Sequence, residues 1–97
     1  MNQQYYVYII TNIINTVLYI GVTNDIVRRI WEHKQGTVNI FSKQYNLYKL
    51  VYYETTDSIE SAILREKQLK KWRRQKKDAL ISEFNSNWHD LYDEIVL

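Results

Sequence analysis

The chain is 97 residues long, carries a formal net charge of +2, and contains two histidines and no cysteine. A chain of this length forms one domain that buries roughly 60–65% of its unfolded surface, which leaves no room for a second recognition domain. The missing cysteines exclude disulfides and thiolate zinc sites, and two histidines do not supply a structural metal site by themselves. Because we find no signal peptide and no apolar run of membrane-spanning length, we expect a soluble cytoplasmic protein without a membrane partner.

The N-terminal part of the sequence predicts a β-hairpin. Residues 4–11 are rich in Tyr, Val and Ile, and because they are apolar on both faces we expect a strand that is central in its sheet or covered on both sides. Residues 17–22 predict the returning strand, and the polar residues between the two predict the connection. The apolar Ile13 and Ile14 in this connection are not explained by turn chemistry.

A helix is predicted over residues 25–35, because apolar residues recur there at helical spacing: Ile26, Val27, Ile30 and Trp31. Gly36 suits the left-handed residue that ends such a helix. At 100° per residue, Arg29 and His33 lie about 40° apart, one turn from each other at the edge of the apolar face. A surface arginine and a histidine packed against Trp31 would give the same pattern, so the spacing alone does not assign them a role.

The remaining sequence predicts a third strand and two more helices. A polar loop over residues 37–46 leads into a strand over residues 47–54. A second helix begins after a polar cap at residue 57 or 58 and extends to about residue 74, and a shorter third helix follows over residues 78–84. The resulting order, ββαβαα, predicts a small α+β domain in which helices flank a three-stranded, mainly antiparallel sheet.

Glu66 occupies an unusual position in the second predicted helix. On a helical wheel it falls between Ala62 and Ile63, in the middle of the apolar stripe. A carboxylate that faces a core costs several kcal/mol unless it is paired, hydrogen-bonded or bound to a metal. Two interpretations follow: Glu66 pairs with Lys70 one turn later, or it points inward as a metal ligand.

The basic residues are concentrated in one segment, residues 65–77, where Glu66 is the sole acid among eight Lys and Arg residues. Such a lopsided charge run favours contact with a polyanion over a self-neutralising solvated face, and its attraction to phosphates does not depend on base sequence. The residues expected to bind nucleic acid are Lys67, Lys70, Lys71, Arg73, Arg74, Lys76 and Lys77.

Two tyrosine motifs and their spacing to the first helix resemble the GIY-YIG nuclease family, in particular its small stand-alone members. The motifs are Tyr6-Val7-Tyr8 and Tyr19-Ile20-Gly21; Arg29 follows Gly21 by eight residues, and His33 follows Arg29 by four. Glu66 in a later helix completes the pattern. The resemblance covers essentially the whole chain as a single nuclease domain, residues 1–97, although the first motif opens with Tyr6 where the family name has glycine.

The resemblance implies phosphodiester hydrolysis and a role for each matching residue. It places Glu66 at one divalent ion, Mg²⁺ or Mn²⁺, which one carboxylate with water and phosphate oxygens is able to hold. It places Arg29 on the phosphate and Tyr8 and Tyr19 in the centre of the site. Gly21, in the second motif, is a further candidate for a structural or site role. The resemblance also matches Asn85, or alternatively Asn87, to a late structural asparagine.

The identity of the base is open at this point. The resemblance favours Tyr8, but a phenol with a pKa of about 10 is ionised only about one part in a thousand at pH 7. His33, with an ordinary pKa near 6.5, accepts a proton directly or from Tyr8. We interpret the pair as Tyr8 assisted by His33.

These observations predict a metal-dependent DNA endonuclease that acts on branched, nicked or single-strand-containing DNA, as in repair or recombination. We expect structure selectivity or weak sequence preference, because the sequence contains no helix-turn-helix, finger or other base-reading motif. The alternative is a nucleic-acid-binding protein that keeps the fold with little or no catalytic activity. A protein-interaction module is disfavoured by the basic segment.

Overall fold

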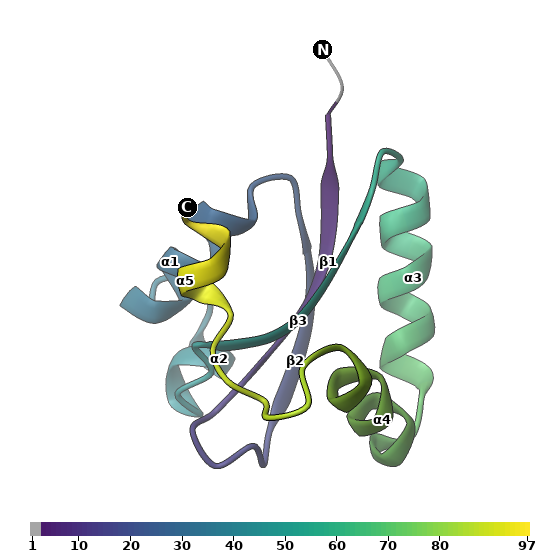
Figure 1. Ribbon diagram of the computed structural model, residues 1–97. Helices are drawn as coiled ribbons and strands as arrows, with labels where there is room; N and C mark the ends of the chain where they lie inside the picture. Colours follow the sequence, from purple (N-terminus) through teal and green to yellow (C-terminus); the bar gives the residue numbers. More distant parts are fainter. Residues whose placement is uncertain (1–2) are drawn as a thin grey trace.

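An antiparallel three-stranded sheet with the strand order β2-β1-β3 lies at the centre of the protein. We analysed a computed structural model that describes residues 3–97 (Figure 1). The elements follow one another along the chain as β1 (Tyr5–Thr11), β2 (Leu18–Thr23), α1 (Ile26–Gln35), α2 (Ile40–Gln44), β3 (Lys49–Thr56), α3 (Ile59–Lys71), α4 (Arg74–Phe84) and α5 (Tyr92–Ile95). The α+β class, the antiparallel sheet and the central position of the first strand are therefore confirmed.

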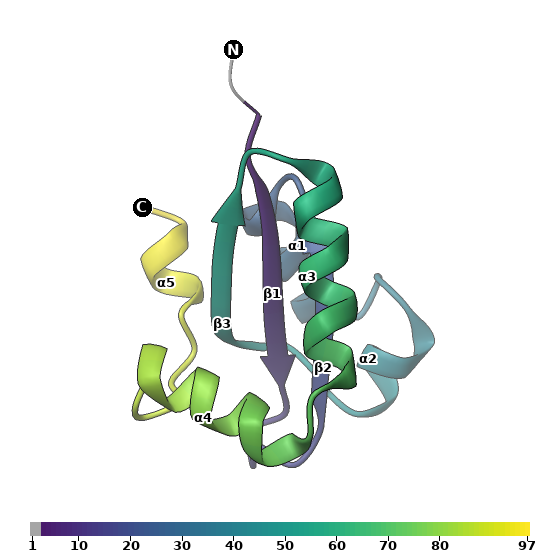
Figure 2. The same ribbon diagram turned by 90° about the vertical axis from the view of Figure 1, so that its right-hand side faces the viewer.

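Helices cover both faces of this sheet. Successive side chains of a strand point to opposite faces, so β1 contributes to two separate cores. Val7 and Ile9 pack with α3 and α4, whereas Tyr8 and Ile10 pack with α1 and with residues near α5. Figures 1 and 2 show these two layers, with α3 on one side of the sheet and α1 on the other. Apolar burial on both faces explains why β1 reads as a continuous hydrophobic run.

Both ends of α1 are capped, and Gly36 ends the helix as the sequence predicts. The side chain of Asp25 accepts a hydrogen bond from the Arg28 backbone N–H at 3.2 Å and so caps the N-terminus. Gly36 ends the helix with a φ of 72°, a left-handed conformation that glycine adopts without steric cost.

The helix boundaries after α1 differ from the prediction. The loop predicted over residues 37–46 contains α2, whose five residues are too few to show a helical period, and α5 was not predicted. The second helix ends at Lys71, and the third begins at Arg74, because Trp72 and Arg73 both adopt extended dihedrals. Trp72 packs against the core there, and its ring lies 4.1 Å from the Lys76 ammonium.

Hydrogen bonds from one asparagine shape the hairpin loop. The Asn12 side-chain oxygen accepts from the backbone N–H groups of Thr16 and Val17 at 2.8 and 3.0 Å. Ile13 and Ile14 at the tip are 72% and 69% exposed, and nothing in the structure explains these apolar residues. In the part of the chain that the structure describes, no helix is long and apolar enough to span a bilayer.

Candidate active site

The site begins with Tyr8, which pairs with Gly21 across β1 and β2. Its side chain is 1% exposed and lies over Gly21. A Cβ added at Gly21 would come within 2.5 Å of the Tyr8 Cζ and would also overlap the hydroxyl. Gly21 is therefore the residue that leaves room for the Tyr8 ring.

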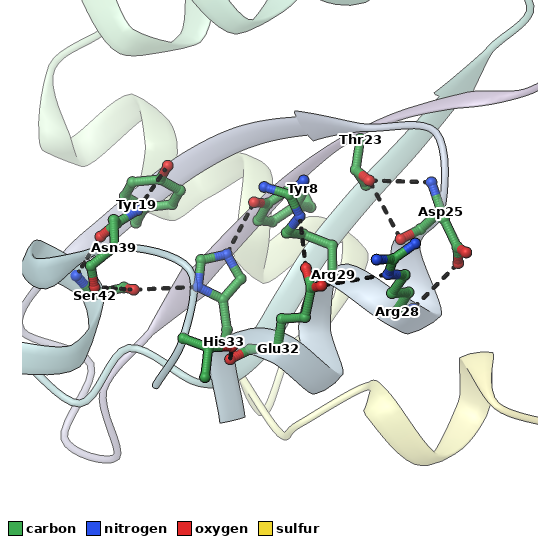
Figure 3. Close-up of polar contacts among 11 residues, drawn as sticks. Tyr8, Tyr19, Thr23, Asp25, Arg28, Arg29, Glu32, His33, Asn39 and Ser42 are labelled. Carbon is green, nitrogen blue, oxygen red and sulfur yellow. Dashed lines mark hydrogen bonds and ion pairs between the residues drawn. The ribbon is translucent and has the colours of Figure 1, made fainter. Parts of the chain in front are cut away.

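His33 meets this tyrosine from α1. The Tyr8 hydroxyl lies 3.0 Å from His33 Nε2, and the other ring nitrogen, Nδ1, lies 3.3 Å from the Ser42 hydroxyl on α2 (Figure 3). We expected His33 where the helix leaves the core and meets solvent, but it is only 3% exposed. The prediction was wrong because α2 covers the side of α1 that the sequence leaves open.

Tyr19 stands beside this pair on the edge strand β2. Its ring centroid lies 6.5 Å from that of Tyr8 and 5.5 Å from that of His33. Its hydroxyl accepts a hydrogen bond from the Asn39 side chain at 3.3 Å. The fold thus brings Tyr8, Tyr19 and His33 into one cluster, in which Asn39 and Ser42 contact Tyr19 and His33 respectively.

Arg29 lies on the solvent side of the cluster. Its side chain is 40% exposed and forms an ion pair with Glu32 at 3.4 Å (Figure 3). Burial raises the pKa of Tyr8, and the positive charge of Arg29 acts in the opposite direction. An open, polar depression of about 440 Å³ adjoins Arg29, lined by Thr23, Asn24, Asp25, Arg28, Arg29 and Glu32. A guanidinium at the rim of such a depression suits an anionic group.

Glu66 approaches from α3, on the opposite face of the sheet. Its side chain is 22% exposed and lies 3.5 Å from Lys70. It is not in the middle of an apolar stripe as we predicted, because Ile59 and Ile63 are 37% and 41% exposed and the buried face is centred on Ala62 and Leu69. Its negative charge nevertheless adds to the effect of burial in raising the pKa of Tyr8.

Burial sets the protonation states of the cluster. Desolvation raises the pKa of Tyr8 well above its ordinary value, the charges of Tyr19 and Glu66 add to this effect, and Arg29 opposes it. Desolvation also lowers the pKa of His33 to about 4, with a further contribution from Arg29 and an opposing one from Glu32. At neutral pH the site therefore contains a protonated phenol hydrogen-bonded to a neutral imidazole.

Within the described residues, the carboxylates do not form a multidentate metal site. Within residues 3–97 no three His, Cys, Asp or Glu side chains are grouped so as to hold an ion. Glu66 alone fits a hard cation such as Mg²⁺, which binds one or two carboxylates and takes its other ligands from water and phosphate. The half-buried Glu66 carboxylate, close enough to raise the Tyr8 pKa, is the position where a cation would offset an unfavourable charge.

Asn85 lies outside this cluster. It is 4% exposed, and its side-chain N–H groups donate to the carbonyls of Val51 at 3.2 Å and His89 at 2.8 Å. It therefore connects β3 to the segment after α4. Among residues 3–97, no polar contact joins Asn85 to the tyrosines, Arg29, His33 or Glu66.

The basic segment spans the end of α3 and the start of α4, and half of its eight cations have partners within the protein. Four of its cations have partners: Arg65 with Glu54, Lys70 with Glu66, Arg74 with Asp78, and Lys76 with the Trp72 ring. Within the described residues, four others form no ion pair: Lys67, Lys71, Arg73 and Lys77.

Sequence reasoning missed Asn39 and Ser42, which contact Tyr19 and His33 from α2. One signal was available, because Asn39 followed by Ser42 has the spacing of a helix N-cap and its N3 residue. The Asn39 side chain does accept from the Ser42 backbone N–H at 2.7 Å.

The arrangement of two tyrosines, an arginine, a histidine and a glutamate agrees with the sequence comparison. Residues 4–79 match the GIY-YIG catalytic domain. The chain belongs to the GIY-YIG nuclease family.

Its relatives include small proteins of similar length. A UPF0213 protein of Haloquadratum walsbyi is 35% identical over 83 residues, which cover 86% of this chain and 92% of that protein. A UPF0213 protein of Staphylococcus saprophyticus is 41% identical over 66 residues, covering 68% and 80% of the two chains. The solution NMR structure of a UPF0213 protein from Bacillus halodurans superposes with a TM-score of 0.52 at 32% identity, over 81% of this chain and 83% of that one. These names specify no substrate.

Proposed function

We propose that this GIY-YIG protein is a divalent-metal-dependent endonuclease that hydrolyses phosphodiester bonds in DNA. The observation that carries the proposal is the buried hydrogen bond of 3.0 Å between the Tyr8 hydroxyl and His33 Nε2, at a phenol whose pKa also responds to the charges of Arg29 and Glu66. Packing alone does not require a buried tyrosine to hydrogen-bond to a neutral imidazole, or to have a pKa that depends on the charges of Arg29 and Glu66.

The attacking water loses its proton to Tyr8, and the Tyr8 hydroxyl proton passes to His33 Nε2. Arg29 holds the phosphate and stabilises the negative charge that develops on it. Burial lowers the pKa of His33, and the Arg29 charge lowers it further. A phosphate bound beside Arg29 offsets this second effect, so the imidazole becomes a better acceptor when substrate is present.

Glu66, together with water and phosphate oxygens, is the residue that would hold Mg²⁺ or Mn²⁺. Nucleases of this family generally use a divalent metal. A cation held there would polarise the phosphate and would supply positive charge near Tyr8, which would favour the phenolate. Without a cation the protonated phenol is favoured, because burial raises the pKa of Tyr8 and the negative charge of Glu66 adds to this effect.

The proposed substrate is branched, nicked or single-strand-containing DNA, cleaved with little sequence preference in repair or recombination. Lys67, Lys71, Arg73 and Lys77 provide cations without ion-pair partners for phosphate contacts, and such contacts carry no base information.

The alternative is a DNA-binding protein with little or no activity. One observation favours it: Arg29 and Glu66 already have partners, Glu32 and Lys70, at 3.4 and 3.5 Å. Both pairs are partly exposed, and such pairs are worth about 0–1 kcal/mol, so a phosphate and a cation would displace them readily.

The decisive experiment is a cleavage assay on duplex, nicked and branched DNA with Mg²⁺, Mn²⁺ or EDTA. We expect metal-dependent cleavage of at least one substrate, and a loss of about 10²-fold or more in Tyr8→Phe, which lacks only the hydroxyl. DNA binding without cleavage under every metal condition would favour the alternative. Equal cleavage by Tyr8→Phe would contradict the assignment of Tyr8.

A further inference from the structure

Ser42 is held rigidly against the catalytic histidine. It is 2% exposed, and backbone hydrogen bonds fix it on both sides: its N–H donates to the Asn39 side chain at 2.7 Å, and its carbonyl accepts from the Leu47 N–H at 2.8 Å. This places its hydroxyl 3.3 Å from Nδ1 of His33, on the side of the ring opposite Tyr8 (Figure 3).

The direction of the hydrogen bond between Ser42 and His33 follows from the other partner of the hydroxyl. The Ser42 O–H donates to the Asn39 carbonyl at 3.4 Å. A hydroxyl has one hydrogen and two lone pairs, so the oxygen faces His33 as an acceptor. The hydrogen between Ser42 and His33 then belongs to Nδ1.

The Tyr8 side of the ring leads to the same conclusion. Within residues 3–97, His33 Nε2 is the one hydrogen-bond partner of the Tyr8 hydroxyl, and Tyr8 is only 1% exposed. The phenol hydrogen is left for His33 Nε2 at 3.0 Å. With the opposite tautomer, His33 Nε2–H would donate to the Tyr8 oxygen, and the phenol hydrogen would have no acceptor in this buried site.

We propose that Ser42 is a positioning residue that holds His33 as the Nδ1–H tautomer, so that Nε2 presents a lone pair to the Tyr8 proton. The role in cleavage rests on the proposed nuclease function, whereas the tautomer is a property of the folded chain. The neutral imidazole has one proton, so fixing it on Nδ1 decides what Nε2 is able to do.

Nitrogen NMR of the histidine rings tests the tautomer without any DNA. At neutral pH we expect the wild-type His33 ring to show a protonated Nδ1 and an unprotonated Nε2. A His89→Gln background leaves a single histidine and removes any ambiguity of assignment, since His89 is exposed and pairs with Glu94. A wild-type ring protonated at Nε2 would overturn the proposal outright.

Two substitutions connect the tautomer to activity. Ser42→Ala removes the acceptor, so we expect a mixture of tautomers and a fall in cleavage of about tenfold, the lower end of the loss seen when a metal-binding histidine loses the hydrogen-bond partner of its other nitrogen. Ser42→Thr keeps a hydroxyl and should restore both measurements. An unchanged tautomer in Ser42→Ala, or unchanged cleavage despite a changed tautomer, would overturn the role.

Thr11→Val is the matched control for simple loss of a buried hydroxyl. Thr11 is 0% exposed and donates to the Val17 carbonyl at 2.7 Å, away from the histidine. We expect this variant to lose stability and to keep the wild-type His33 spectrum. If Ser42→Ala does not fold, the wild-type and Ser42→Thr spectra still decide the tautomer. If the wild type cleaves no DNA, the nuclease proposal fails while the spectra still decide the tautomer.

Discussion

At the scale of single residues, the site depends on one glycine, which leaves room for the Tyr8 ring, and on one partly buried carboxylate, that of Glu66. Gly21 lies beneath the Tyr8 ring, and its position on β2 fixes where that ring lies. Glu66 is partly exposed and pairs with Lys70 in its resting state. Substitutions at the two positions therefore separate steric from electrostatic requirements.

Gly21→Ala should displace Tyr8 and break its hydrogen bond to His33. The added Cβ overlaps the ring and hydroxyl, so we expect a loss of about 1–3 kcal/mol in unfolding free energy, measured by urea denaturation, and a larger loss of cleavage than the folded fraction explains. Gly36→Ala is the control. Its φ of 72° makes alanine cost about 1–2 kcal/mol, but its Cβ meets only Lys43. Equal cleavage per folded molecule in the two variants would contradict the steric argument.

Glu66→Gln should abolish metal-dependent cleavage with little change in stability. The residue keeps its shape and loses a partly exposed i,i+4 ion pair, so the unfolding free energy without metal should change by about 0.5 kcal/mol or less. Any stabilisation by Mg²⁺ in melting curves should disappear, while DNA binding persists. Lys70→Gln removes the same ion pair but keeps the carboxylate, and its stabilisation by Mg²⁺ should survive. A destabilised yet active Glu66→Gln variant would contradict the metal assignment.

At the scale of elements, the break between α3 and α4 changes how the basic segment is used. Arg74 donates to the carbonyls of Asn15 and Thr16 at 2.6 and 2.9 Å, so it holds the hairpin loop against α4. Arg65 pairs with Glu54 at 2.7 Å. Arg65 and Arg74 therefore stabilise contacts within the protein. We expect the DNA contacts to come from the cations that have no such partners.

Neutralising Lys67, Lys71 and Arg73 together should reduce the salt dependence of DNA binding. Each lost phosphate contact lowers the slope of log affinity against log salt by about 0.9 on duplex DNA, so we expect a decrease of up to about 2.7. Fluorescence anisotropy across a series of salt concentrations measures the slope, and circular dichroism checks the fold. An unchanged slope would place the DNA-binding surface elsewhere.

At the scale of the whole molecule, the sheet holds together a site whose parts come from both of its faces. Tyr8, Tyr19 and His33 belong to the layer that contains α1, whereas Glu66 belongs to α3 on the other face. Assembly of the site therefore requires the complete fold. Burial of His33 in this fold also links stability to pH.

The protein should lose stability as pH falls from about 6.5 towards 4 through His33. Its folded pKa of about 4 lies below the ordinary value of 6.5, so between these pH values the unfolded chain binds more protons than the folded chain. The His33 contribution to the unfolding free energy therefore decreases as the pH falls through this range. The contribution approaches about 3 kcal/mol and is fully present above pH 6.5. Urea denaturation at several pH values should show a shallower decline in His33→Gln than in wild type. His89→Gln, at an exposed ion pair, should retain the wild-type decline.

Local features of the sequence determined the main elements and the residues of the site. Runs rich in Tyr, Val and Ile predicted the first strands, because aromatic and β-branched residues suit a buried pleated surface. Helical spacing predicted α1, because that period reflects burial of one face of the helix. The Asp25 and Gly36 caps are contacts between near neighbours in the chain, so α1 could be placed within a residue. The spacing of Tyr8, Tyr19, Arg29 and His33 was readable for the same reason.

Only the tertiary structure decided how these residues are covered and paired. A helical wheel gives the direction of a side chain but not which neighbour packs there, so it placed His33 at the solvent edge and Glu66 too deep. The five residues of α2 are too few to show a helical hydrophobic period in the sequence. This helix nevertheless covers His33 and contains Ser42. Burial by a distant segment removes water from the imidazole and lowers its pKa, and this effect has no signature in the local sequence.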